Sequence, residues 1–314
     1  MNPRWLTIAL LCFAACGKSD DKNPVIATPS PRSGPIVFSS QRDGNAEIYV
    51  LYPDSASPAR MTNNSAADRE PAWSPDGARI AFVSDRDGDP EIYVMNSDSS
   101  GQSRLTFNPG ADGHPAWSPD GTKLAFVSEV TGNAEIFLMN ADGTDTTNVT
   151  KNPGQDRWPT WSPDGARIAF QSTRDYSTDI YVMNADGSNQ IALTNARFWS
   201  ARPTPARPAP GVLIWSAMCP DWSPDGGKIA FIAWDGGLAG IQVMSPNGYS
   251  HSFLMQDWGY EASPAWSRDG ARLAFATRRD GNSEIYVMDA DGRRLVRLTE
   301  NSAEDEAPDW GPGK

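Results

Sequence analysis

The chain has 314 residues, of which 39% are hydrophobic and 21% charged, a composition typical of a globular protein. Its formal net charge is −12 at pH 7, which argues against nucleic acid as a partner because phosphate binding needs a basic face. The same charge argues against a purely electrostatic attachment to anionic lipid.

Residues 1–15 have the features of an export signal. Arg4 is followed by an apolar run over residues 5–15, which is too short to cross a bilayer as a helix. Small residues then lead to Cys16. This arrangement resembles a bacterial lipoprotein signal, which implies removal of residues 1–15 and lipidation of Cys16. An ordinary secretory signal cut near Ala15 and a buried apolar N-terminus are the alternatives.

Residues 16–33 are rich in proline, serine and charged side chains and have no hydrophobic periodicity. Such a composition is typical of an extended, solvated tether. Because Cys12 lies in the signal and Cys16 would carry the lipid, Cys219 has no cysteine partner and no disulfide bond is expected. We expect Cys219 to be a small buried hydrophobic side chain.

One motif recurs six times along the rest of the chain, each copy centred on a tryptophan: Trp73, Trp117, Trp161, Trp222, Trp266 and Trp310. Successive tryptophans are 44 residues apart, except for a single step of 61 between Trp161 and Trp222. A period in this range indicates a radial array of small sheets.

Residues 111–150 contain one complete repeat. Segments 115–117, 123–128, 135–140 and 146–150 have the length and composition of short strands, and turn-forming residues separate them. Ser-Pro-Asp-Gly at 118–121 predicts a type I turn that closes the first hairpin. Four-stranded meanders at this spacing are propeller blades. We therefore predict an all-β fold over residues 34–314, a six-bladed β-propeller of four-stranded antiparallel blades.

Two further residues recur in every repeat and are predicted to form the core between blades together with the tryptophans. They are a phenylalanine in the second strand and an isoleucine ten residues later in the third: Phe38, Phe82, Phe126, Phe170, Phe231, Phe275, and Ile48, Ile92, Ile136, Ile180, Ile241, Ile285.

The two ends of the array complement each other. The chain enters the array at Pro35 with a second strand, and it ends with a first strand that contains Trp310. We infer that the C-terminal strand completes the first blade and closes the ring, which leaves no free sheet edge.

The repeat can be written W-S-P-D-G-x-x-I-A-F-x-S-x-R-D-G-x-x-E-I-Y-V-M-N-x-D-G. It resembles the repeat of TolB-type propellers, which are related to the propellers of prolyl-oligopeptidase-like and tricorn proteases. The resemblance covers about residues 34–312 and implies a six-bladed periplasmic propeller.

The sequence offers little for catalysis. It has no G-x-S-x-G motif, and its only histidines, His114 and His251, occupy different positions of the repeat. Two histidines do not make the ligand set that a catalytic metal needs. We expect a non-enzymatic protein without a cofactor or a metal.

Five residues before the tryptophan, five of the six repeats carry an acid: Asp68, Asp112, Asp156, Glu261 and Asp305. One interpretation is an acidic ring at the mouth of the channel that holds a cation or a basic segment. The other is a structural role, in which the carboxylates bind backbone N–H groups near the blade junction. Three residues before the tryptophan the side chain differs in every repeat, as expected of a surface without a scaffold role: Glu70, His114, Trp158, Cys219, Ser263 and Ala307.

The long step contains an insertion at about 195–217 that is rich in arginine, aromatic residues and proline. Arginine and aromatic side chains are typical of protein-binding hot spots, and loops often carry function. We predict a partner-binding surface formed by Arg197, Phe198, Trp199, Arg202 and Trp215, joined by Trp158, Trp258 and Tyr260. The alternative is an insertion that packs over its own blade and covers the channel.

Together these features predict a monomeric propeller lipoprotein of the bacterial cell envelope, with the outer membrane favoured over the inner. It would bind a protein or peptide partner, contact the membrane only through its lipid anchor and bind no nucleic acid. Binding of carbohydrate or cell-wall glycan is the alternative, since tryptophans also stack on sugars, and a metal-dependent lyase or hydrolase is the third.

Replacing both Trp199 and Trp215 with alanine is expected to abolish partner binding, because hot-spot tryptophans carry most of the energy of an interface. The affinity of the purified double variant for its partner provides the measurement. Unchanged affinity would exclude the insertion as the binding surface.

Overall fold

The computed structural model describes residues 34–313, with gaps at 53–54, 56, 176, 195–215, 235–238 and 258–260. The side chains of residues 256, 257, 261 and 262 are also outside the description. Cys16, the residues of the insertion (Arg197, Phe198, Trp199, Arg202 and Trp215), Trp258 and Tyr260 therefore lie outside the described residues, as do the signal and the tether.

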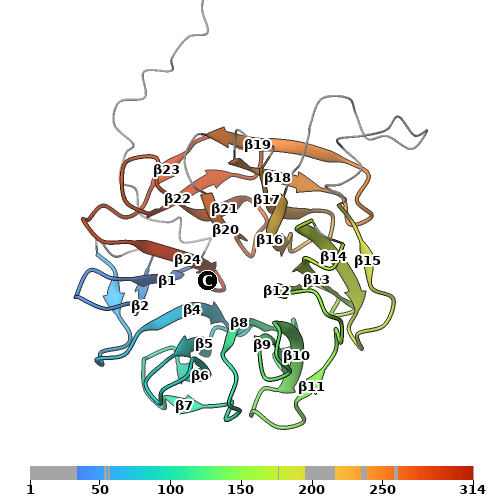
Figure 1. Cartoon of the computed structure of the whole chain (residues 1–314). Coiled ribbons are helices and arrows are strands. Elements are labelled where there is room, and N and C mark those ends of the chain that lie inside the picture. Colours follow the sequence, from blue (N-terminus) through green and yellow to red (C-terminus); the bar gives the residue numbers. More distant parts are fainter. Residues whose placement is uncertain are drawn as a thin grey trace, which may run out of the picture.

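Six four-stranded antiparallel sheets form a closed ring around a central axis (Figure 1). Every regular element in the described ranges is a β-strand. Each blade has one strand next to the axis, followed outward by three further strands. The first blade contains β24 (Asp305–Trp310), β1 (Ile36–Ser40), β2 (Glu47–Leu51) and β3 (Ala59–Arg60). The second contains β4 (Asp68–Trp73), β5 (Arg79–Ser84), β6 (Glu91–Asn96) and β7 (Ser103–Arg104). The third contains β8 (Asp112–Trp117), β9 (Lys123–Ser128), β10 (Glu135–Asn140) and β11 (Thr147–Asn148).

The remaining three blades follow the same order. The fourth contains β12 (Asp156–Trp161), β13 (Arg167–Ser172), β14 (Asp179–Asn184) and β15 (Ile191–Ala192). The fifth contains β16 (Ser216–Trp222), β17 (Ile229–Trp234), β18 (Ala239–Met244) and β19 (His251–Asp257). The sixth contains β20 (Glu261–Trp266), β21 (Arg272–Thr277), β22 (Glu284–Asp289) and β23 (Val296–Arg297). The predicted fold class is confirmed. In the third blade the middle strands match the prediction, whereas the inner strand begins earlier, at Asp112, and the outer strand is shorter.

The C-terminal strand closes the ring as predicted. β24 pairs antiparallel with β1, and Trp310 lies opposite Ile36 in the register. Beyond the ladder, the N–H of Gly311 donates to the carbonyl of Pro35 at 2.8 Å. The side chain of Trp310 is completely buried. The first blade therefore has its innermost strand from one end of the chain and its other three from the opposite end.

The hydrophobic core consists of six separate clusters, one at each junction between blades. In one of them Trp117 and Phe126 of the third blade pack against Val83 and Ile92 of the second. The indole N–H of Trp117 also donates to the carbonyl of Ala72 in the preceding blade, at 3.2 Å. The recurring phenylalanines, isoleucines and tryptophans thus join neighbouring blades, which confirms the predicted core.

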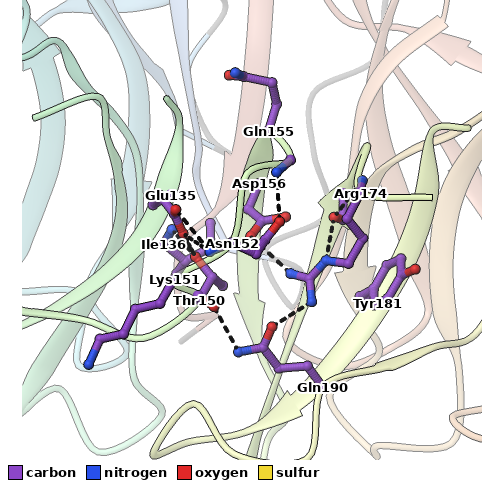
Figure 2. Close-up of polar contacts among 12 residues, drawn as sticks. Glu135, Ile136, Thr150, Lys151, Asn152, Gln155, Asp156, Arg174, Tyr181 and Gln190 are labelled. Atoms are coloured by element: carbon purple, nitrogen blue, oxygen red, sulfur yellow. Dashed lines mark hydrogen bonds and ion pairs between the residues drawn. The ribbon is translucent and has the colours of Figure 1, made fainter. Parts of the chain in front are cut away.

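A buried polar network connects the loop between blades to the inner strand (Figure 2). At the junction of the third and fourth blades, Asn152 and the guanidinium of Arg174 both donate to the carboxylate of Asp156, the latter at 2.9 Å. The backbone N–H of Asn152 donates to Glu135 at 3.0 Å, and Arg174 lies over the ring of Tyr181, 4.6 Å from its centroid. Because buried charges are stable only when paired, this network holds the start of β12 in place.

Deletion of residues 305–314 is expected to unfold the propeller. Loss of a buried tryptophan alone costs about 3–5 kcal/mol, a large part of the total stability of about 5–15 kcal/mol of a typical domain. Thermal unfolding followed by circular dichroism provides the measurement, with a chain lacking only residues 313–314 as the control. A peptide of residues 305–314 added in trans should restore the transition. A cooperative transition in the truncated chain alone would contradict the closed ring.

Candidate functional site

The inner strands of all six blades surround a cavity of about 520 Å³ on the ring axis. We call the end of this cavity where the inner strands begin the insertion end, because β16 starts directly after residues 195–215. The opposite end holds the turns between first and second strands. Each inner strand contributes to the wall the residues around the proline and tryptophan that recur in all six repeats. Equivalent positions therefore form layers around the axis.

The upper layer, nearer the insertion end, contains the residue that lies three before each tryptophan: Glu70, His114, Trp158, Cys219, Ser263 and Ala307. All six have left-handed backbone geometry, with φ between 50° and 52°. At each, the register with the second strand shifts, as it does between Arg69 and Ala72. A bulge of this kind re-aims a side chain out of the ladder. The position that varies most among the repeats is therefore the one presented to the axis.

Three neighbouring members of the upper layer contact one another. The carboxylate of Glu70 accepts a hydrogen bond from the backbone N–H of His114 at 2.7 Å and lies 3.1 Å from Nδ1 of its imidazole. The ring of His114 then packs on Trp158, with centroids 4.6 Å apart. Burial lowers the pKa of His114 although Glu70 opposes the shift. The imidazole is therefore neutral at pH 7.

The upper layer residues of the fifth, sixth and first blades are smaller. Cys219 packs at the border of the core cluster between the fifth and sixth blades. Burial raises its pKa to about 12, with a hydrogen bond from the backbone of Ser263 acting in the opposite direction. The thiol is therefore protonated at neutral pH, and the reactive thiolate is not its resting form.

The lower layer contains the residue directly before each tryptophan: Ala72, Ala116, Thr160, Asp221, Ala265 and Asp309. Asp221 accepts hydrogen bonds from the backbone N–H of Trp266 at 2.7 Å and from the hydroxyl of Thr160 at 3.1 Å. Asp309 accepts one from the backbone N–H of Trp73 at 2.7 Å. Among the described residues, neither carboxylate forms an ion pair within 4.0 Å.

The two lower layer carboxylates are destabilised when they are ionised. Burial raises the pKa of Asp221 to about 7, and the charge of Asp309 raises it further, whereas the N–H of Trp266, Thr160 and Arg268 lower it. Burial likewise raises the pKa of Asp309, against the effect of Arg268. A pair of half-buried carboxylates without a counter-ion is uncommon in a structural role, because it costs stability whenever both are ionised.

Arg268 lines the same cavity below the two aspartates. Five repeats have proline two residues after the tryptophan, and each proline packs toward the turn glycine of the following blade, as Pro75 does against Gly121 and Pro312 against Gly77. The blade that follows Arg268 is the first one, whose inner strand is β24. Arg268 extends across this junction, and its guanidinium donates to the carbonyls of Trp310 at 3.3 Å and Trp73 at 3.5 Å.

The strand-start acids occupy a different place from the predicted ring at the channel mouth. Asp68, Asp112, Asp156 and Asp305 are at most 2% exposed and do not line the cavity. Arginines pair with three of them at 2.8–2.9 Å, and an asparagine donates to all four. These contacts correct the prediction for the four acids and favour their structural role. Glu261 begins β20, but its side chain lies outside the described residues.

Of the predicted partner-binding residues, the structure describes only Trp158, which lines the cavity. Sequence reasoning missed Asp221, Asp309 and Arg268. The signal was present, since alanine stands at the lower layer position in three repeats and proline at the turn position in five. Among the described residues, no group of three or more His, Cys, Asp or Glu side chains is arranged to hold a metal ion. The described part also contains no helix long and apolar enough to cross a bilayer.

A closed ring of six repeated blades with an axial cavity lined by variable residues defines a six-bladed β-propeller. The family model of the TolB beta propeller domain matches residues 22–112, 107–207 and 214–314. The chain therefore belongs to the TolB-type β-propeller family.

Solved structures agree with this assignment at the level of the fold. TolB from Acinetobacter baumannii is 24% identical, with a TM-score of 0.76 over 91% of this chain and 68% of that chain. A putative TolB from Agrobacterium tumefaciens is 24% identical, with a TM-score of 0.64 over 83% and 88%. Oligogalacturonate lyase from Vibrio parahaemolyticus is 14% identical, with a TM-score of 0.58 over 89% and 78%. No curated protein sequence matches the chain. These similarities show the fold alone.

Replacing Asp221 with asparagine is expected to stabilise the protein at about pH 8 and to have little effect at about pH 4. The raised pKa means that the folded state holds its proton more tightly than the unfolded state, so the free energy of unfolding falls as the pH rises from about 4 to about 7. One pKa unit corresponds to about 1.4 kcal/mol, and we expect a gain of about 1–2 kcal/mol because water in the cavity reduces the full effect.

Thermal unfolding at both pH values measures this difference. Asp89→Asn provides the control, since Asp89 is an exposed turn residue with the same change of charge. An equal effect of Asp221→Asn at both pH values would show that Asp221 is not strained as an anion.

Proposed function

We propose that this chain is a non-enzymatic binding module of the bacterial cell envelope, which holds a protein or peptide partner at the insertion end of its axial cavity. One observation carries the proposal. Six inner strands with the same backbone geometry present six different side chains to one cavity, at a position where the scaffold makes no demand on side-chain identity. A concave site with few convergent polar groups is the usual form of a ligand site.

The same proposal includes the location of the module. In it, residues 1–15 direct export, Cys16 carries the lipid, and residues 16–33 hold the propeller away from the membrane surface. The membership of the TolB-type family supports an envelope role. The apolar run before Cys16 supports the lipid anchor, and the outer membrane is the favoured site. We propose that the propeller acts as a monomer, with the insertion residues Trp199 and Trp215 extending the binding surface.

Replacing Trp158 with alanine is expected to reduce capture of the partner from envelope extract by about tenfold or more, the size typical of a hot-spot tryptophan. The backbone should tolerate the change because Ala307 already occupies the equivalent left-handed position in the first blade. Crosslinking and pull-down with the purified chain provide the measurement. Tyr249→Ala serves as the control, because Tyr249 is 74% exposed in a turn at the opposite end of the propeller.

Two further measurements distinguish this proposal from its alternatives. A glycan array with the same variants tests carbohydrate binding, and metal analysis of the purified protein tests a metal-dependent lyase or hydrolase. Glycan binding that depends on Trp158, or a stoichiometric metal with lyase activity, would replace the proposal.

A further inference from the structure

Large and small side chains are distributed unevenly around the axial cavity. In the upper layer, blades two to four carry the large residues Glu70, His114 and Trp158, whereas blades five, six and one carry Cys219, Ser263 and Ala307. The lower layer has the opposite pattern, because both carboxylates, Asp221 and Asp309, belong to the blades with small upper residues. The wall of Trp158 and His114 therefore faces an open side that leads down to two carboxylates.

The depth of this open side matches one long side chain. The two layers are two residues apart along each inner strand, which corresponds to at most about 7 Å, the rise of two residues in a regular β-strand. A lysine or arginine whose backbone lies at the upper layer can place its cationic group at the lower layer, while its aliphatic stem passes the proline and tryptophan walls. The ring of Trp158 also offers a face to which a passing cation is attracted.

The charge at the lower layer also favours a cation. Asp221 and Asp309 make one backbone hydrogen bond each, and Thr160 adds one more to Asp221. Arg268 is the basic group that acts on both carboxylates among the described residues, and it directs its guanidinium to backbone carbonyls instead. The scaffold does not require the carboxylates, because alanine occupies the same position in blades two, three and six.

We propose that the axial cavity is selective for a peptide segment that inserts a lysine or arginine side chain past Trp158 and binds it between Asp221 and Asp309. This inference rests on the proposed function, of which it names the ligand chemistry. It assigns to the two aspartates a role that explains their cost to stability, since strained polar groups kept at a site are typical of binding and catalysis.

The test uses four acetylated tripeptide amides with glycine at both ends and lysine, arginine, norleucine or glutamate in the centre. Calorimetry with the purified chain at about pH 8 should show the lysine or arginine peptide binding at least about tenfold more tightly than the norleucine peptide, the gain expected of one charge-assisted hydrogen bond. The glutamate peptide should bind most weakly.

Asp221→Ala and Asp309→Ala are the matched variants, because Ala265 and Ala72 show that alanine fits this position. Each should remove most of the preference for the basic peptides while leaving the melting temperature unchanged or raised. Asp89→Asn should leave the preference unchanged. Arg268→Gln removes the competing cation and should strengthen binding of the basic peptides.

Protonation provides an independent check. Lowering the pH from about 8 to about 5 should weaken binding of the basic peptides, because Asp221, which faces Asp309, Arg268 and Thr160, becomes neutral. Equal affinity for the lysine and norleucine peptides, or a preference that survives in both aspartate variants, would overturn the inference. If partner capture still depends on Trp158 in that case, the proposed function stands without it. Tight binding of free lysine amide without any gain from the flanking peptide groups would overturn the peptide assignment.

Discussion

The antiparallel pairing of β24 with β1 is the interaction on which the rest of the molecule depends. It joins residues from the two ends of the described chain and buries Trp310 completely. A propeller blade cannot bury both of its faces alone, and the six core clusters exist only while every blade has two neighbours. The same pairing places Asp309 beside Trp73 and within the electrostatic reach of Asp221 and Arg268. Closure therefore creates both the fold and the charged end of the cavity.

The repeats separate the scaffold from the site in a simple way. Positions that pack between blades are nearly identical, because each tryptophan meets the same neighbours. The bulge in each inner strand turns one residue per blade toward the axial cavity. A left-handed non-glycine residue costs about 1–3 kcal/mol, and six of them form one layer here. The backbone geometry therefore costs the same free energy in every blade, whichever side chain it presents to the axis.

Much of the fold could be predicted from the sequence, but only part of the site. The spacing of the tryptophans predicts blade number, and the turn sequences predict the hairpins. The acids such as Asp156 were open to two interpretations, because the sequence does not show that Arg174 and Asn152 donate to the same carboxylate. Trp158 was chosen for its aromatic character, and the structure adds that it lines the axis and packs on His114. Asp221 and Asp309 were overlooked because they lie far apart in the chain.

The sequence alone determined the architecture, because six repeats of the same strands and turns can bury their six equivalent apolar faces by packing against one another in a closed ring. Local hydrogen bonds and hydrophobic periodicity act over a few residues, and the repeat displays them six times. Only the tertiary structure decided which of the residues that depart from the repeat lie close together. Asp221, Arg268 and Asp309 come from three blades, and only closure of the ring brings them around one cavity. Their chemistry depends on burial and on mutual charge, and neither property is encoded in the spacing along the chain.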